Sequence, residues 1–204
     1  MKHISRPEID ALEKVYKLNL INSCSGYKSA NLIGTISDNG LENVAIFSSV
    51  IHMGSSPPLL GFVTRLNEKP KDTFSNIKAS GFYTINHISS DIIDQAHQTA
   101  ANYNSEVSEF EKTGLNPIYK DGFVAPFVAE SPLQIAMKLV EEVHIKRNNT
   151  ILVLGEIQAI YVKEDMLQID GYLDLSLGHV TSINGVDGYS LPKPLERFEY
   201  ARPK

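Results

Sequence analysis

The chain has 204 residues, 42% of them hydrophobic, so it can bury a sizeable core, and we expect a single domain over residues 1–204. Its formal net charge of −5 excludes a broad basic face of the kind that binds nucleic acid. Because the sequence has neither an apolar run long enough to span a bilayer nor an N-terminal signal pattern, it predicts a soluble, cytoplasmic protein without a membrane partner.

The first quarter of the chain predicts a helix followed by a β-hairpin. Apolar residues at helical spacing indicate a helix over about residues 7–18. The loop that follows contains the single cysteine, Cys24, which has no CxxC partner or neighbouring base that would make it a redox thiol. Residues 32–36 and 44–47 have the composition of strands, and the Asn39-Gly40 pair between them is a strong hairpin signal.

The next stretch combines a loop, a strand and the start of a helix. We expect the loop over residues 54–58, the strand over 59–64 and a short helix over 72–77. The loop is rich in glycine, serine and proline, which are typical of turns. The expected strand thus ends a few residues before the expected helix begins.

Positive charge gathers where that strand ends, at Arg65, Lys69 and Lys71. An arginine can hold two phosphate oxygens as a planar fork, whereas lysines act as mobile point charges. The free N–H groups at the start of the following helix also favour an anion, and Thr73 can offer its hydroxyl there. This pattern indicates a phosphate site. The alternative is a solvated loop in which Asp72 or Thr73 only caps the helix.

His52 is the histidine best placed for chemistry, because it follows directly after the second strand of the hairpin. Its near-neutral pKa would suit proton delivery or substrate binding, and it could equally satisfy a hydrogen bond within a loop. The remaining histidines show no paired spacing for metal ligands, and no cysteine cluster accompanies them. We therefore predict no metal site.

The middle of the chain contains a β-rich run over residues 81–86 and then a helical insertion over about 89–126. In this insertion we expect a helix capped by Ser89 or Ser90, a second from Ser105 to Gly114 and an irregular segment that is a candidate for substrate selection. Two later runs, 133–139 and 150–162, have the composition of paired strands, although spacing alone also allows a helix in the first.

Several spaced motifs occur in one order along the chain: residues 31–35, 43–50 and 57–62, then Arg65, Lys71-Asp72-Thr73, Asn76-Ile77 and residues 83–86. Together they resemble the flavin reductase-like family with the FMN-binding split barrel, over most of the chain from about residue 22 to 203. The resemblance implies a mainly β fold with peripheral helices, a split β-barrel of the FMN-binding type. It also favours a strand at 133–139, and a close-packed or bent strand at Gly155.

The resemblance also implies a homodimer that binds FMN between its subunits, with reduced nicotinamide, NAD(P)H, as the usual electron donor. Arg65, Lys71 and Thr73 are then expected at the phosphate, and His52 on the substrate side as a candidate catalytic group. The remaining expected cofactor-binding residues are Thr35, Asn43, Ala45, Phe47, Ser48, Ser49 and Val50. Because side chains alternate along a strand, Asn43, Ala45 and Phe47 should share one face.

Two functions fit this interpretation. The first is an FMN-dependent oxidoreductase, in which the flavin carries the redox chemistry between NAD(P)H and a small-molecule acceptor or free flavin, with an oxygenase as a partner. The second is a non-catalytic FMN-binding module that senses redox state or stores flavin. The absence of a GxGxxG motif after a strand gives no support to a Rossmann domain.

Overall fold

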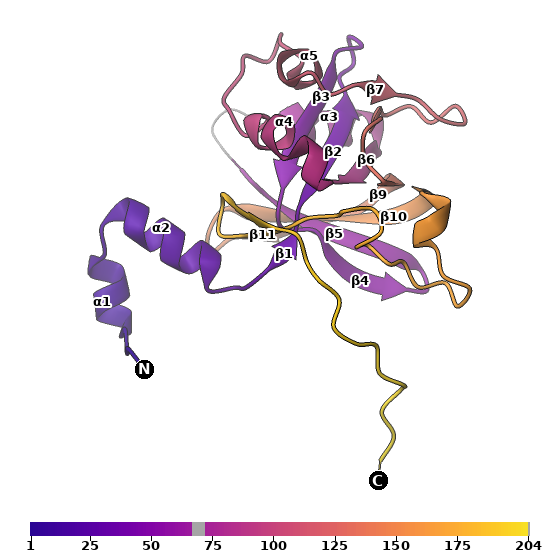
Figure 1. Ribbon diagram of the computed structural model, residues 1–204. Helices are drawn as coiled ribbons and strands as arrows, with labels where there is room; N and C mark the ends of the chain where they lie inside the picture. Colours follow the sequence, from indigo (N-terminus) through magenta and orange to yellow (C-terminus); the bar gives the residue numbers. More distant parts are fainter. Residues whose placement is uncertain (67–71, 204) are drawn as a thin grey trace.

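The computed structural model describes residues 1–66 and 72–203, and a seven-stranded antiparallel sheet forms its centre (Figure 1). The strand order is β3-β2-β6-β9-β10-β5-β4. The bounds are β2 Asn31–Ile36, β3 Glu42–Phe47, β4 Ile51–Ser55, β5 Pro58–Arg65, β6 Phe82–His87, β9 Leu133–Ile145 and β10 Thr150–Val162. The predicted hairpin and the pairing of the two late strands are both confirmed.

Shorter elements surround this sheet. Two small sheets are formed by β1 (Lys28–Ser29), β11 (Ser182–Asn184) and β12 (Gly188–Ser190), and by β7 (Pro117–Ile118) and β8 (Phe127–Val128). The helices are α1 Arg6–Ala11, α2 Lys14–Ser23, α3 Asp72–Ser80, α4 Ile93–Gln98 and α5 Glu109–Thr113, with 3-10 turns η1 Ser90–Ile92 and η2 Glu164–Met166. Within the described parts of the chain, every helix is too short or too polar to cross a bilayer.

The two edge strands of the large sheet meet end to end. β3 and β4 are the edge strands, yet residues 48–50 alone connect them in sequence. A connection of this length spans at most about 15 Å, so the last residue of β3 and the first of β4 must lie close together. Among the described strands, β3 pairs with β2 and β4 pairs with β5, but the two edges do not pair with each other. At residues 48–50 the chain thus passes from pairing with β2 to pairing with β5, and we call this segment, where the edge strands meet without pairing, the split of the barrel.

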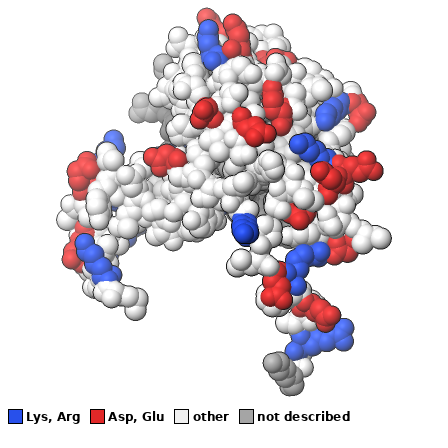
Figure 2. All heavy atoms as spheres, viewed as in Figure 1, with Lys and Arg blue, Asp and Glu red and all other residues white. Residues whose placement is uncertain are grey.

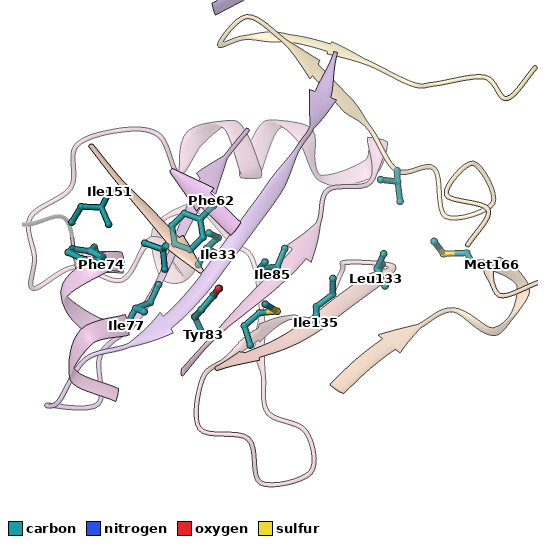
Figure 3. Close-up of a cluster of buried hydrophobic side chains, with 13 residues drawn as sticks. Ile33, Phe62, Phe74, Ile77, Tyr83, Ile85, Leu133, Ile135, Ile151 and Met166 are labelled. Atoms are coloured by element: carbon teal, nitrogen blue, oxygen red, sulfur yellow. The ribbon is translucent and has the colours of Figure 1, made fainter. Parts of the chain in front are cut away.

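Both faces of the central strands are buried. Ile33 of β2 belongs to a core cluster that also contains Phe62, Tyr83 and Ile85, and Figure 3 shows these side chains between the strands and α3. The adjacent residue Leu32 belongs to a second cluster on the opposite face. β3 follows the same alternation, since Phe47 packs against the first cluster and Val44 lies in the second. The predicted division of β3 into two faces is therefore confirmed.

Gly155 of β10 makes close packing possible in the first cluster. A Cβ atom at this position would collide with the hydroxyl of Tyr83, and the pairing of β9 with β10 shifts register beside it. The Tyr83 hydroxyl is buried and has no hydrogen-bond partner among the described residues, and burial raises its pKa. The glycine thus leaves room for a large ring in the barrel core.

The N-terminal segment forms two helices rather than the single helix expected over residues 7–18. Leu12 and Glu13 have extended backbones, with ψ of 144° and 146°, which breaks the helix. The Glu13 carboxylate then caps α2 by accepting hydrogen bonds from the N–H groups of Val15 and Tyr16. We call α1 and α2 the N-terminal arm and residues 191–203 the C-terminal tail; both stand away from the sheets (Figures 1 and 2).

Two other sequence predictions need correction, and one open alternative is resolved. The expected loop at 54–58 begins inside a strand, because β4 extends to Ser55 and pairs with β5. The second helix of the insertion begins at Glu109 instead of Ser105, although it ends at Gly114 in the left-handed conformation as predicted. The strand expected at 133–139 is confirmed and continues as β9 to Ile145, so the alternative helix over 133–143 is excluded. Cross-strand pairing, which a local pattern does not contain, decided the two strand cases.

Candidate functional site

Five buried polar side chains meet between the sheet and two helices. Asn43 of β3 lies at the centre, and its Oδ1 accepts hydrogen bonds from the hydroxyls of Thr35 at 3.1 Å and Thr73 at 3.0 Å. Its Nδ2 donates to Oε2 of Glu109 in α5 at 2.7 Å. Asn76 of α3 donates to Thr35 Oγ1 at 3.1 Å. We call these residues the Asn43 cluster.

The Asn43 cluster contains three of the residues predicted to bind the cofactor, and their side chains are already engaged. Thr35, Asn43 and Thr73 are all buried and hydrogen-bonded within the cluster. The Thr73 hydroxyl therefore points into the protein, and the main-chain N–H groups at the start of α3 are what that helix end offers to an anion. Sequence reasoning missed the roles of Asn76 and Glu109 in the cluster. The signal for Asn76 was its spacing of three residues from Thr73, which places both on one helix face.

A small cavity adjoins the Asn43 cluster. It is lined by Ser37, Leu41, Asn43, Asn76, Ser105 and Val107, and its volume is about 30 Å³. This is room for about one water molecule beside polar groups. The cavity connects the cluster to the turn of the β2–β3 hairpin and to the segment before α5.

The two cations of the predicted phosphate site differ in what the structure records. Arg65 is exposed at the last position of β5, opposite Thr150 of β10. Lys71 lies outside the described residues, as does Lys69. β5 and α3 are consecutive elements separated by residues 66–71, so the strand end that carries Arg65 and the helix start that carries Thr73 are joined by a short connection.

Residues 48–50 lie at the split of the barrel and are held from two sides. The Ser49 hydroxyl donates to the carbonyl of Val63 at 3.1 Å and accepts from the Val63 N–H at 3.0 Å, which ties the segment to β5. Ser29 donates to the carbonyl of Val50 at 3.4 Å. The outer edges of β3 and β4 beside this segment have main-chain N–H and C=O groups that no described strand pairs. Such an edge can hydrogen-bond to the polar rim of a flat ring.

The other residues predicted near the ring follow the alternation of β3. Phe47 packs against the first core cluster, with its ring edge-on to Phe62 at a centroid distance of 5.0 Å. Ala45 is partly buried opposite Ile33 of β2. Ser48 is also partly buried. Phe47 thus supports the wall of the barrel, while the small side chains of Ala45 and Ser48 leave the backbone near the split accessible to a neighbour.

His52 lies on the exposed edge strand β4. Its Nε2 is 3.2 Å from the Ser55 hydroxyl, and a bulge interrupts the pairing of β4 with β5 between His52 and Gly54. Bulges redirect side chains at sheet edges. The imidazole is therefore accessible to solvent and lies two residues from the split.

Two buried polar atoms lie opposite each other on β2 and β6. Asn31 and His87 are register partners, and Asn31 is also the partner of Phe47 on β3. Asn31 Oδ1 and His87 Nδ1 have no hydrogen-bond partner among the described residues. Burial lowers the pKa of His87 to about 4, so its ring is neutral at pH 7. Sequence reasoning did not select either residue, because nothing local marks Asn31 as buried or His87 as partly buried with an enclosed Nδ1.

Candidate metal ligands do not gather anywhere in residues 1–66 and 72–203. No group of three or more His, Cys, Asp or Glu side chains in these ranges is arranged to hold an ion. Cys24 is exposed, and its thiol contacts the carbonyl of Ile21.

Comparisons with known proteins match this chain to a protein family by sequence and to solved structures by fold. A model of the flavin reductase like domain matches residues 25–176. A crystal structure of a candidate flavin reductase with a split barrel domain from Shewanella frigidimarina is 47% identical, with a TM-score of 0.95 over 98% of this chain and 100% of that one.

Two further solved structures share the fold at lower identity. The 2-nitrobenzoate 2-nitroreductase of Pseudomonas fluorescens is 22% identical, with a TM-score of 0.83 over 98% of this chain and 96% of that one. Nitrilotriacetate monooxygenase component B of Bacillus cereus is 20% identical, with a TM-score of 0.81 over 98% of each chain. These likenesses establish a split-barrel architecture over almost the whole chain.

Proposed function

Because this chain belongs to the flavin reductase-like family, we propose that it is an FMN-dependent oxidoreductase that takes electrons from NAD(P)H and passes them to a second acceptor. The acceptor is a small molecule or free flavin. When bound, the flavin supplies the redox chemistry, and the chain supplies binding and orientation. The observation that carries the proposal is the split at residues 48–50, where unpaired strand edges lie beside small side chains. From this segment the chain continues through β4 and β5 to Arg65, and the next element after Arg65 is α3.

At the phosphate end, Arg65 and Lys71 provide positive charge and α3 provides main-chain N–H groups. A phosphate monoester is nearly a dianion at neutral pH, so it favours a site that combines these donors. Thr73 contributes its N–H, since its hydroxyl is donated to Asn43. Thr35 and Asn43 act on this end through α3, because both belong to the cluster that holds the helix against the sheet.

At the ring end, residues Ala45 to Val50 form the wall on which the ring lies. Ala45, Phe47, Ser48, Ser49 and Val50 present a small and partly buried surface, fixed to β5 by the Ser49 hydroxyl. Electron transfer to and from a flavin needs alignment of the two reactants more than it needs a side-chain acid. A rigid wall provides that alignment.

His52 is the candidate substrate-side residue. It is exposed on β4 near the split, and its position leaves the imidazole free to contact a bound substrate. His52→Ala should change turnover while the dissociation constant for FMN stays within about twofold, as expected for a residue that contacts substrate alone. Unchanged steady-state kinetics would return His52 to a purely structural role in the β4–β5 hairpin.

The proposed assembly is a cytoplasmic homodimer with FMN between subunits. Large apolar side chains on the N-terminal arm and C-terminal tail, including Val15, Tyr16, Phe198 and Tyr200, are exposed in the single chain, which favours a partner that covers them. Dilution to monomer should release the flavin, as followed by fluorescence, and a monomer that retains flavin would contradict a shared site. One fold relative is a monooxygenase component, which supports an oxygenase as a further partner.

The phosphate assignment is tested by comparing FMN with riboflavin, which lacks the phosphate. Arg65→Ala should weaken FMN binding by about tenfold or more and riboflavin binding by less than about threefold. Lys163→Ala is the matched control, because Lys163 is exposed just past the far end of β10, about 40 Å along the strand from the partner of Arg65. Equal losses for both ligands in Arg65→Ala would refute the assignment.

Steady turnover separates an enzyme from a storage module. With catalytic amounts of FMN-loaded protein, NAD(P)H absorbance at 340 nm should fall continuously in air or with added free flavin. A module that only stores flavin or senses redox state would consume about one equivalent of NAD(P)H and then stop. An absorbance spectrum of the pure protein with added FMN, before and after reductant, shows whether flavin is bound at all.

A further inference from the structure

The Asn43 amide joins three elements that are far apart in the sequence. Its Oδ1 accepts from Thr35 in β2 and Thr73 in α3, and its Nδ2 donates to Glu109 in α5. The residue is buried, at 6% exposure, so these contacts are shielded from water. Thr73 is the second residue of α3, and Asn76 on the next turn is bonded to Thr35. The start of α3 is therefore fixed to the sheet at two points.

The Glu109 carboxylate decides which way the amide points. A carboxylate accepts hydrogen bonds and does not donate them when ionised, so the NH₂ group of Asn43 must face Glu109 and its oxygen must face the threonines. In that orientation both threonine hydroxyls donate to the same oxygen, and Thr35 is left to accept from Asn76. The reverse orientation would oppose two acceptors at 2.7 Å. Glu109 thus sets the direction of the hydrogen bonds in the cluster.

We propose that Asn43 is a positioning residue for the phosphate end of the flavin site, and that Glu109 of α5 fixes its orientation. The inference rests on the proposed FMN function and assigns Asn43 an action through α3 rather than a direct contact. The Thr73 hydroxyl is held away from solvent, while the main-chain N–H groups of the first turn keep a fixed place on the sheet. The insertion that carries α5 thereby supports the anion site from behind.

The proposal is tested with a variant of equal size and reversed hydrogen bonding. Asn43→Asp keeps an oxygen for the two threonines but places a second carboxylate oxygen against Glu109. We expect the dissociation constant for FMN to rise by about tenfold or more, and that for riboflavin by less than about threefold. Adding Glu109→Gln restores a donor and an acceptor at this contact, so the double variant should bind FMN within about threefold of the wild type.

Asn116→Asp is the matched control. Asn116 also donates its amide to a carboxylate, that of Glu130 at 2.6 Å, but this pair is exposed and lies outside the Asn43 cluster. The control should leave both dissociation constants within about twofold. Equal weakening of FMN and riboflavin in Asn43→Asp, or failure of Glu109→Gln to restore FMN binding, would overturn the proposal.

A second measurement does not depend on flavin. In the ligand-free protein, the amide protons of residues 74–80 should exchange faster in Asn43→Asp than in the wild type and return to the wild-type rate in the double variant. If Asn43→Asp does not fold, the double variant alone carries the test, since it should fold and bind FMN normally. A wild type that binds no FMN would refute the proposed function, whereas unchanged exchange in α3 would refute the positioning role.

Discussion

The strands β2, β3 and β6 and the two terminal segments contain similar apolar residues but bury them to opposite extents. In β2, five of the six residues are buried, and the two faces of the strand belong to two core clusters. α1 and α2 of the N-terminal arm contain no buried residue, and in the C-terminal tail Leu195, Phe198 and Tyr200 are almost fully exposed. Burial therefore depends on whether neighbours in space cover a side chain, not on its hydrophobicity alone.

The largest expected effect is the contrast between Phe62 in the core and Phe198 in the tail. Phe62 contacts Phe47 and Tyr83 edge-on, so Phe62→Ala should lower the free energy of unfolding by about 3–5 kcal/mol. Phe198→Ala should change the stability of the monomer by less than about 0.5 kcal/mol. Urea denaturation at low protein concentration measures both. A similar loss in the two variants would show that the tail is part of the monomer core.

His87 gives the buried region a pH dependence. Its pKa is about 4 in the folded chain and about 6.5 when unfolded, so the unfolded state binds the proton more tightly between these values. The contribution of His87 to stability is then complete above pH 6.5 and is lost as the pH drops toward 4, by about 3 kcal/mol in total.

Denaturation curves between pH 4 and pH 7 measure this dependence against a matched pair. His87→Leu should flatten the slope, while the exposed His52 replaced by leucine should leave it unchanged. A wild-type slope that persists in His87→Leu would assign the acid sensitivity to other groups.

Two glycines compare a position in the core of the sheet with one on its exposed edge. Gly155→Ala places a Cβ against the Tyr83 hydroxyl and should cost about 1–3 kcal/mol of unfolding free energy. Gly54→Ala on the edge strand β4 meets its nearest atom, the carbonyl oxygen of Pro57, at 3.4 Å and should cost much less. Thermal melting compares the two variants. Equal melting temperatures would mean that Tyr83 moves aside without penalty.

The smallest expected effect is in the C-terminal tail. Arg197 donates to the Asp170 carboxylate at 2.7 Å and lies over the Tyr172 ring, with both charges exposed. Exposed ion pairs contribute little to global stability, so Arg197→Ala should leave the melting temperature unchanged. It should nevertheless speed cleavage after residue 190 in limited proteolysis, because this contact fastens the tail to the body. An unchanged cleavage rate would show that other contacts hold the tail.

The sequence by itself determined the elements whose causes are local. The Asn-Gly turn and alternation predicted the β2–β3 hairpin, and Gly114 predicted the end of α5. The motif pattern led to the family and to α3 as a helix that starts after a run of cations. These features depend on hydrogen bonds or spacing within a few residues, which a single sequence displays directly.

Only the tertiary structure decided which polar side chains remain available to a ligand. Thr73 looked like a phosphate donor, yet its hydroxyl bonds to Asn43, 30 residues away, and Asn43 in turn bonds to Glu109, 66 residues away. The split at residues 48–50 likewise follows from the order of seven strands, not from any local signal. A residue's partners across such distances depend on register and packing, and these are properties of the whole folded chain.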